Sequence, residues 1–143
     1  MLRKITLTGG LLAGCVWCLA LVSRADSAPA GPGDGSFKPV STVHGLMNGQ
    51  RLLLGQIGEA IKDKGMKKRS EQIQAYAEVL AELANVNTLN SEKEDYRGWA
   101  AELRAHSLKL AAEAKGNAAD GSLNEIVATI KATCQTCHDA YQE

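Results

Sequence analysis

Hydrophobic residues recur at intervals of three and four positions between Ser41 and Asp63, which is the spacing of one face of an α-helix. The apolar positions of this stretch are Val43, Leu46, Met47, Leu53, Leu54, Ile57 and Ile61. Gly65 follows as a natural end for the helix, because glycine adopts the left-handed backbone conformation at a C-terminus without strain. The pattern therefore predicts a first helix over residues 41–63.

Three further stretches repeat this periodicity and predict three more helices. The second runs from about Lys68 to Val86, with an apolar side made of Ile73, Tyr76, Ala77, Leu80, Leu83 and Ala84. The third ends before Gly116 and carries Tyr96, Trp99, Ala100, Leu103, Leu110, Ala111 and Ala114. The fourth carries Leu123, Ile126, Val127, Ile130, Cys134, Cys137, His138 and Tyr141.

Two S-x-x-E sequences mark the expected starts of the third and fourth helices. They pair Ser91 with Glu94 and Ser122 with Glu125. In such a capping box the hydroxyl and the carboxylate satisfy backbone N–H groups that have no partner inside the helix. We therefore expect Ser91 and Ser122 to be the N-cap residues of these two helices.

The remaining patterns agree with an all-α fold. No segment alternates hydrophobic and polar residues with a period of two, and no proline follows Pro39. Four helices with short connections are typical of an antiparallel four-helix bundle, in which inward-facing side chains form cofactor sites. Residues 41–143 are thus predicted to be one such domain.

The first 25 residues have the layout of a secretory signal peptide. Arg3 and Lys4 provide a positive start, residues 5–22 carry no charge, and Ser23 and Ala25 are small residues suited to a cleavage site. The chain is therefore expected to be exported to the periplasm.

Three alternatives for this segment stay open. Cleavage could follow Ala30, the uncharged run of 18 residues could remain as a membrane anchor, or Cys15 could be lipidated. The residues after Cys15 stay apolar up to Val22, which favours a cleaved signal. Residues 26–40 hold all three prolines and are expected to form a flexible linker.

Charge and cysteine content narrow the function classes. The whole chain has 16 basic and 16 acidic side chains, so the strongly basic class of nucleic-acid-binding proteins is excluded and no nucleic-acid partner is expected. Cleavage after Ala25 would leave a mildly acidic protein with two cysteines, Cys134 and Cys137. Aromatic residues make up only 4% of the chain, so the core must be aliphatic or be completed by something other than an amino acid.

The sequence Cys134-Gln-Thr-Cys137-His138 is the attachment signature of c-type haem. Residues at positions i, i+3 and i+4 share one face of a helix, so both thiols and the imidazole project the same way. The thiols would form thioether bonds with one covalently attached haem c per chain, and His138 would be the proximal iron ligand. The pair Cys15 and Cys18 has the same spacing but is followed by Leu19.

Three other readings of Cys134 and Cys137 are weaker. A thioredoxin-like redox pair needs a βαβ context, and a zinc site needs a fourth ligand that the mature chain does not supply. A disulfide between residues three apart in a helix is poorly placed geometrically.

A four-helix chain with C-x-x-C-H in its last helix, close to the C-terminus, resembles the class II c-type cytochromes (cytochrome c′ and cytochrome c556). The resemblance covers about residues 41–143. It implies that Cys134 and Cys137 bind haem, that His138 is the fifth iron ligand, and that the sixth position lies on the first helix. A methionine there implies low-spin electron transfer, and a non-ligating apolar residue implies a high-spin protein that binds small gases.

Met47 is the predicted distal ligand, because it is the only methionine of the first helix and lies on its apolar stripe. His44 as a nitrogen ligand and an open iron site facing Leu54 are the alternatives. Relatives often carry an arginine four residues before the distal position, where this chain has Val43. If Arg51 is that arginine, the distal site shifts to Gly55 or its neighbour Leu54.

The resulting expectation is an exported mono-haem cytochrome, not an enzyme, that carries single electrons between redox partner proteins. The alternative is a five-coordinate protein that binds NO or CO. Class II relatives are often dimers through their first two helices, so a homodimer is also implied. The basic residues Lys62, Lys64, Lys67, Lys68 and Arg69 form either a docking patch for an acidic partner or, as we favour, a solvated loop.

Overall fold

The computed structural model describes residues 39–141 of the 143-residue chain. This part contains four α-helices and no strand, which confirms the predicted all-α class for these residues. The helices are α1 (Val43–Lys62), α2 (Arg69–Asn87), α3 (Glu94–Lys115) and α4 (Asp120–Tyr141). The predicted signal peptide over residues 1–25 lies outside the described residues, as do residues 26–38 of the predicted linker, Gln142 and Glu143.

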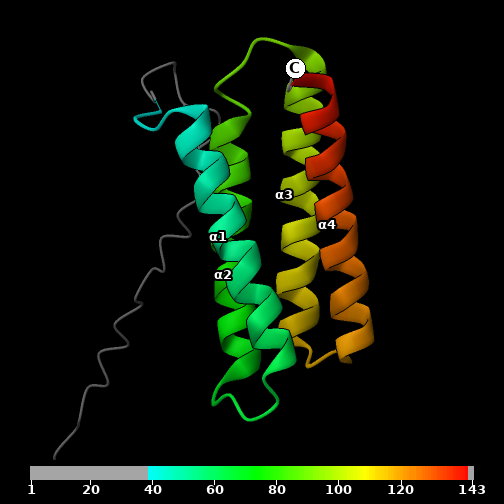
Figure 1. Ribbon diagram of the computed structural model, residues 1–143. Helices are drawn as coiled ribbons and strands as arrows, with labels where there is room; N and C mark the ends of the chain where they lie inside the picture. Colours follow the sequence, from blue (N-terminus) through cyan, green and yellow to red (C-terminus); the bar gives the residue numbers. More distant parts are fainter. Residues whose placement is uncertain (1–38, 142–143) are drawn as a thin grey trace, which may run out of the picture. The chain divides into compact units, whose positions relative to one another are not determined.

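Successive helices run in opposite directions and pack against one another (Figure 1). α1 also contacts α4, less closely than the helices that follow one another in the chain. The start of α1, the end of α2, the start of α3 and the end of α4 therefore share what we call the upper end (Figure 1). The loops from α1 to α2 and from α3 to α4 lie at the lower end. No helix within residues 39–141 is long and apolar enough to cross a membrane.

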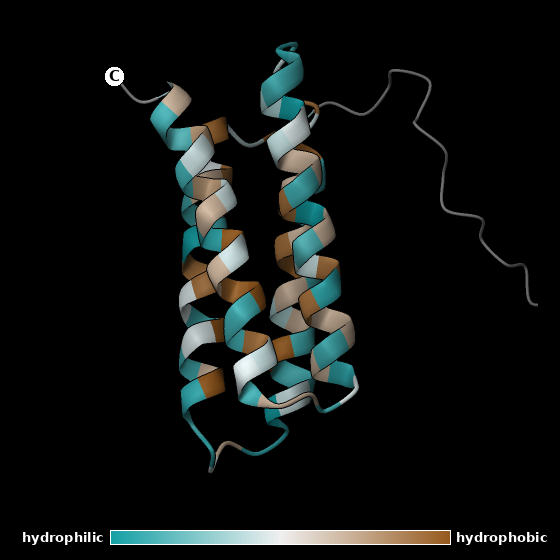
Figure 2. Ribbon diagram, turned by 90° about the vertical axis from the view of Figure 1, so that its right-hand side faces the viewer, coloured by the Kyte–Doolittle hydropathy of each residue, from teal (hydrophilic) through white to brown (hydrophobic). Residues whose placement is uncertain are grey.

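Each helix carries both hydrophobic and hydrophilic residues along its length (Figure 2). One aliphatic core joins all four helices. Its buried members are Ile57, Ala60, Ile61, Ile73, Ala77, Leu80, Ala84, Leu103, Leu110, Ala111, Ala114, Leu123, Ile126, Val127 and Ile130. Each large aliphatic side chain contributes roughly 1.5–3 kcal/mol by leaving water. The core begins only at Ile57 in α1 and ends at Ile130 in α4, so it is concentrated towards the lower end.

Both predicted capping boxes are wrong. α3 begins at Glu94 with Lys93 as its N-cap, and the Ser91 hydroxyl accepts a hydrogen bond from the Lys93 N–H at 3.2 Å. α4 begins at Asp120, so Ser122 lies inside the helix. At this start, the Asp120 carboxylate pairs with Arg69 and Lys64, an interaction with distant residues that a local sequence pattern does not reveal.

Gly49 allows α1 and α2 to approach closely. A Cβ atom at this position would lie 3.2 Å from Leu83 Cδ1, which is tighter than ordinary van der Waals contact. The space beside Gly55 and Gly58 is open, because a Cβ atom at either position would meet no neighbouring atom of the described residues within 4 Å. Helix packing therefore accounts for the first of these glycines and not for the other two.

The Arg69 guanidinium ties three helix ends together at the lower end. Its Nε donates to the carbonyl oxygen of Ala60 at 2.8 Å, and one Nη donates to that of Ile61 at 2.9 Å. These carbonyls belong to the last turn of α1, where no N–H of the same helix is available. The same Nη also binds the carboxylate of Asp120 at the start of α4. Arg69 itself is the first residue of α2.

Replacing this guanidinium should destabilise the fold. We expect Arg69→Met to lower the free energy of unfolding by roughly 2–3 kcal/mol, because two buried carbonyls and a partly buried carboxylate lose a charged donor. Urea unfolding followed by circular dichroism measures the effect. Arg104→Met, on the exposed face of α3, is the matched control and should change stability by no more than about 0.5 kcal/mol. Equal losses in both variants would contradict the role of Arg69.

Candidate functional site

A pocket of about 670 Å³ lies between the helices and is lined by residues of all four. Its volume is within the roughly 300–1,000 Å³ that is usual for small-molecule and cofactor sites. Most of its lining comes from the first half of α1, the first half of α3 and the last turns of α4. The pocket therefore lies towards the upper end, and Leu80, Leu103 and Ile130 of the aliphatic core form part of its lining.

The last turns of α4 bring the whole C-x-x-C-H group to this pocket. Cys134, Cys137 and His138 all line it, as expected for residues that share one helical face. Cys137 is buried, while Cys134 and His138 are half-buried. Both cysteines are free thiols, and neither forms a disulfide.

Burial raises the pKa of both thiols above its ordinary value. For Cys137, the neighbouring Cys134 and Asp95 raise the pKa further by charge repulsion. Thiols with raised pKa values stay protonated near neutral pH, whereas redox-active pairs and metal ligands depend on thiolates. In addition, no group of three or more His, Cys, Asp or Glu side chains among residues 39–141 is placed to hold a metal ion. The raised pKa values argue against a redox-active pair.

The first helix brings three of the predicted distal candidates to the same pocket, whereas Gly55 is not part of its lining. Met47 lines it and is half-buried, His44 lines it from the exposed first turn, and Leu54 lines it from the middle of α1. Arg51 also lines the pocket, although its side chain is exposed. The remaining described histidine, His106, is half-buried and is not part of the lining.

Met47 lies nearer the upper end of α1 than Leu54 does. α1 begins and α4 ends at the upper end (Figure 1). With a rise of 1.5 Å per residue, Met47 lies about 6 Å from the start of α1, Leu54 about 16 Å from it, and His138 about 4.5 Å from the end of α4. Met47 and His138 are therefore each near the upper end of their own helix, whereas Leu54 is about two turns further down α1.

Three buried polar atoms of the described residues have no hydrogen-bond partner: Gln50 Nε2, Asn87 Oδ1 and the hydroxyl of Tyr96. All three residues line the pocket, and they come from three different helices. A buried polar atom without a partner costs about 1–3 kcal/mol, so native proteins rarely keep one without a reason. Volume, donor atoms and unpartnered polar groups together fit a bound group that is larger than a few water molecules.

An aromatic cluster holds the last turn of α4 against the start of α3. The ring of Tyr141 meets those of Tyr96 and Trp99 edge to face, with centroids 6.0 and 5.8 Å apart. Its hydroxyl donates to Asp95 Oδ1 at 2.5 Å, and Lys93 Nζ lies 4.4 Å from its ring centroid. Tyr141 is three residues beyond His138, so these contacts fix the helical turn that carries the imidazole.

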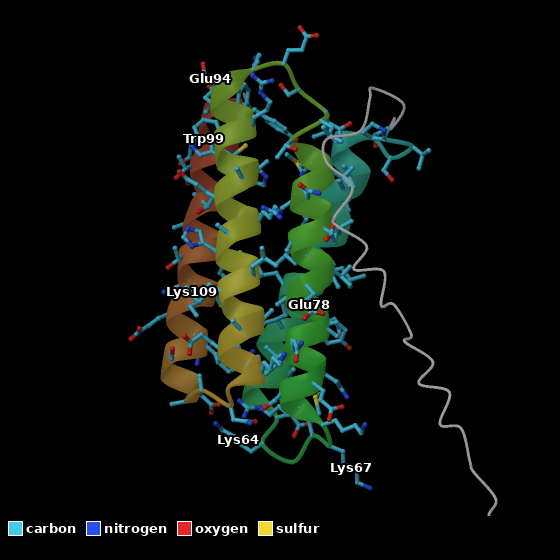
Figure 3. All side chains as sticks on the ribbon, turned by 180° about the vertical axis from the view of Figure 1, so that it is seen from behind. Lys64, Lys67, Glu78, Glu94, Trp99 and Lys109 are labelled. Carbon is cyan, nitrogen blue, oxygen red and sulfur yellow. The ribbon has the colours of Figure 1, made fainter. Side chains whose placement is uncertain are left out.

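The basic cluster of the first loop lies far from the pocket. Lys64 and Lys67 are at the lower end, whereas Glu94 and Trp99, at the start of α3, are at the upper end (Figure 3). Lys62 pairs with Glu59 at 3.0 Å and Lys68 with Glu71 at 3.1 Å, while Lys64 and Arg69 both pair with Asp120. Four of the five basic side chains thus have an acidic partner within the protein, which favours the interpretation as a solvated loop over a docking patch.

Comparisons of the chain with protein-family models, with curated proteins and with solved structures found no match. The chemistry of the pocket therefore has to be inferred from its own residues.

Sequence reasoning missed two polar residues of the pocket, Gln50 and Asn87. Both occupy positions where the apolar stripe continues in register: Gln50 lies between Met47 and Leu54 in α1, and Asn87 lies three residues after Ala84 in α2. A polar residue at an expected core position was the available signal. Tyr96 was predicted to face the core, but its unpartnered hydroxyl could only be found from the structure.

The Tyr141–Asp95 hydrogen bond should make stability depend on alkaline pH. It raises the pKa of Tyr141 to about 12, and it lowers that of Asp95. Because the unfolded chain loses the tyrosine proton near pH 10, the contribution of the bond is complete below that pH and is lost as the pH rises towards 12. The stability difference between the wild type and Tyr141→Phe should therefore shrink over this interval.

Urea unfolding at several pH values measures this difference. In a parallel absorbance titration, Asp95→Asn should return the pKa of Tyr141 towards its ordinary value. A stability difference that stays constant from pH 9 to pH 12 would show that the bond does not form in solution.

Proposed function

We propose that this chain is a c-type cytochrome that holds one haem covalently in the pocket and carries single electrons between partner proteins. The observation that carries the proposal is that all residues of the C-x-x-C-H signature with a role in attachment line one pocket together with Met47. The uneven distribution of the aliphatic core along the bundle supports this proposal. The four helices bury aliphatic side chains mainly closer to the lower end than these residues. The likeness to class II c-type cytochromes agrees with the four helices in this order.

Cys134 and Cys137 would make the covalent attachment. Each thiol would hold the haem by adding its S–H group across one vinyl group, with the sulfur on one carbon, the hydrogen on the other and nothing released. The protonated state that burial favours for both thiols supplies this hydrogen. One turn of helix separates the two sulfurs, and it fixes the orientation of the cofactor relative to α4.

The His138 imidazole and the Met47 thioether would hold the haem iron. The haem supplies a one-electron ferric–ferrous couple, and no bond of a substrate is made or broken. A methionine ligand raises the reduction potential, and burial tunes it further. The aromatic contacts of Tyr141 hold the turn that carries His138, which reduces the freedom of the imidazole.

Met47 also favours electron transfer over gas binding. A half-buried thioether that lines the same pocket as His138 could act as the second iron ligand and leave no coordination site for NO or CO. His44 in the first turn is the other residue able to ligate from this side. Export to the periplasm stays a proposal that rests on the predicted signal peptide, and it agrees with the extracytoplasmic maturation of c-type cytochromes.

Covalent attachment can be tested by denaturing the protein. When the full chain is expressed with a c-type maturation system, haem should stay with the polypeptide on denaturing electrophoresis. Cys134→Ala with Cys137→Ala should release it, because no thioether can form. Cys15→Ala with Cys18→Ala is the matched control and should leave attachment unchanged. Extraction of haem from the wild type by acid alone would end the proposal of covalent binding.

The identity of the sixth ligand can be read from the absorption spectrum. The ferric wild type should be low-spin with a methionine–iron band, and Met47→Ala should make it high-spin. His44→Ala should leave the spectrum unchanged, because this exposed side chain is not the expected ligand. A high-spin wild type that Met47→Ala does not alter would favour the gas-binding alternative instead.

A further inference from the structure

One carboxylate is held against the last turn of α4. Asp95, in the first turn of α3, accepts two hydrogen bonds on the same oxygen, from the Tyr141 hydroxyl at 2.5 Å and from the backbone N–H of Tyr96 at 2.8 Å. Exposed side chains ordinarily change rotamer within nanoseconds, whereas these two bonds tie the carboxylate to α3 and α4 at once. The charge of Asp95 is therefore held in one place relative to both helices.

The surroundings of Asp95 keep it ionised. The hydrogen bond from Tyr141, then that from the Tyr96 N–H, and the positive charge of Lys93 together hold the pKa of Asp95 below its ordinary value. The backbone dipoles at the start of a helix also favour a negative charge in its first turn. The start of α3 thus presents a permanent negative charge to the end of α4.

The aromatic ring of Tyr141 connects this charge to the pocket. The ring packs edge to face against Tyr96 and Trp99, and both of these residues line the pocket. Tyr141 lies three residues beyond His138, which is about 4.5 Å along the helix axis. The carboxylate that binds the Tyr141 hydroxyl is therefore close to the turn that carries the imidazole.

The field of Asp95 extends to the attachment side of the pocket. After burial and the neighbouring Cys134, the charge of Asp95 is a further cause that raises the pKa of Cys137. Lys93 carries the opposite charge to the same place, with its Nζ 4.4 Å from the centroid of the Tyr141 ring. Two charges of opposite sign thus lie beside one aromatic ring at the end of α4.

Fixed charges near a redox centre change its reduction potential. A haem iron carries one more positive charge in the ferric state than in the ferrous state. A nearby negative charge stabilises the ferric state more strongly and lowers the potential, and a nearby positive charge raises it. Salt screens the effect when the charges are exposed, as those of Asp95 and Lys93 are.

We propose that Asp95 lowers the reduction potential of the bound haem and that Tyr141 is the positioning residue that holds its charge in place. This inference rests on the proposed function. The charge acts against the rise in potential that a methionine ligand brings, so the start of α3 sets the direction in which electrons flow as much as the ligand on α1 does.

Redox titration of the covalent holoprotein, followed by absorbance, tests the inference. Asp95→Asn should raise the potential by about 20–30 mV at low ionic strength, which is roughly a twofold to threefold change in the equilibrium constant of reduction at about 59 mV per factor of ten. Lys93→Met should shift the potential in the opposite direction. Both shifts should shrink at high salt, because both side chains are exposed.

Two further variants separate the charge from a loosening of the helix end. Glu94→Gln is the matched control, because it removes an exposed carboxylate next to Asp95 at the same upper end (Figure 3) and should shift the potential less than half as far. Tyr141→Phe frees the Asp95 carboxylate and should raise the potential, with no further rise when Asp95→Asn is added. Equal shifts for Asp95→Asn and Glu94→Gln, or shifts of the same sign for Asp95→Asn and Lys93→Met, overturn the inference.

A measurement without haem distinguishes failure of the inference from failure of the proposed function. In a full chain whose other three cysteines are replaced by alanine, Cys137 is the only thiol. Asp95→Asn should speed its alkylation by iodoacetamide at neutral pH about twofold to threefold, because less repulsion leaves more thiolate. Glu94→Gln should leave the rate unchanged. An unchanged rate in Asp95→Asn overturns the inference, whereas a wild type that acquires no covalent haem refutes the proposed function.

Discussion

The arrangement of the helices depends on the two hydrogen bonds and the ion pair that the Arg69 guanidinium makes. The connection from α1 to α2 reverses the chain within a few residues and leaves the last carbonyls of α1 without partners. Arg69 satisfies two of them and at the same time holds the first residue of α4. Because one rigid planar group serves three helix ends, their relative positions at the lower end are fixed together.

Because the helix ends are tied at the lower end, the side chains of the upper end can pack in a different way. The aliphatic core is densest where the helix ends are tied, and it thins out towards the start of α1 and the end of α4. Three of the four aromatic residues within residues 39–141 gather near the start of α3 and the end of α4: Tyr96, Trp99 and Tyr141. Tyr96 and Trp99 also line the pocket.

The sequence was sufficient for the features that depend on one helix at a time. The hydrophobic period located all four helices within a few residues, and the spacing of Cys134, Cys137 and His138 correctly placed them on one face. Features that depend on two or more helices were missed. At the start of α4, Asp120 pairs with Lys64 of the first loop and with Arg69 of α2, and no S-x-x-E pattern records these contacts.

Inside the pocket too, the sequence predicts features of a single helix and misses those that depend on several helices. Met47 was predicted from its place on an apolar stripe, and it does line the pocket. Gln50 and Asn87 lie on the same kind of stripe, where a polar residue usually signals a break in the core. Only the packing of the helices shows that both residues line one pocket and that each carries a buried polar atom without a partner. Which polar residues stay unsatisfied is decided by neighbours that are distant in sequence.

The looser contact between α1 and α4 has a consequence for the order of folding. The pairs α1–α2, α2–α3 and α3–α4 join segments that are adjacent in the chain, so each can form after closure of a short loop. The contact between α1 and α4 requires the two ends of the domain to meet, which costs the most chain entropy and returns the fewest contacts. Topology thus favours formation of the α1–α4 contact last, after the three helical hairpins have formed. The side of the pocket that carries the thiols would then stay accessible until the final step of assembly.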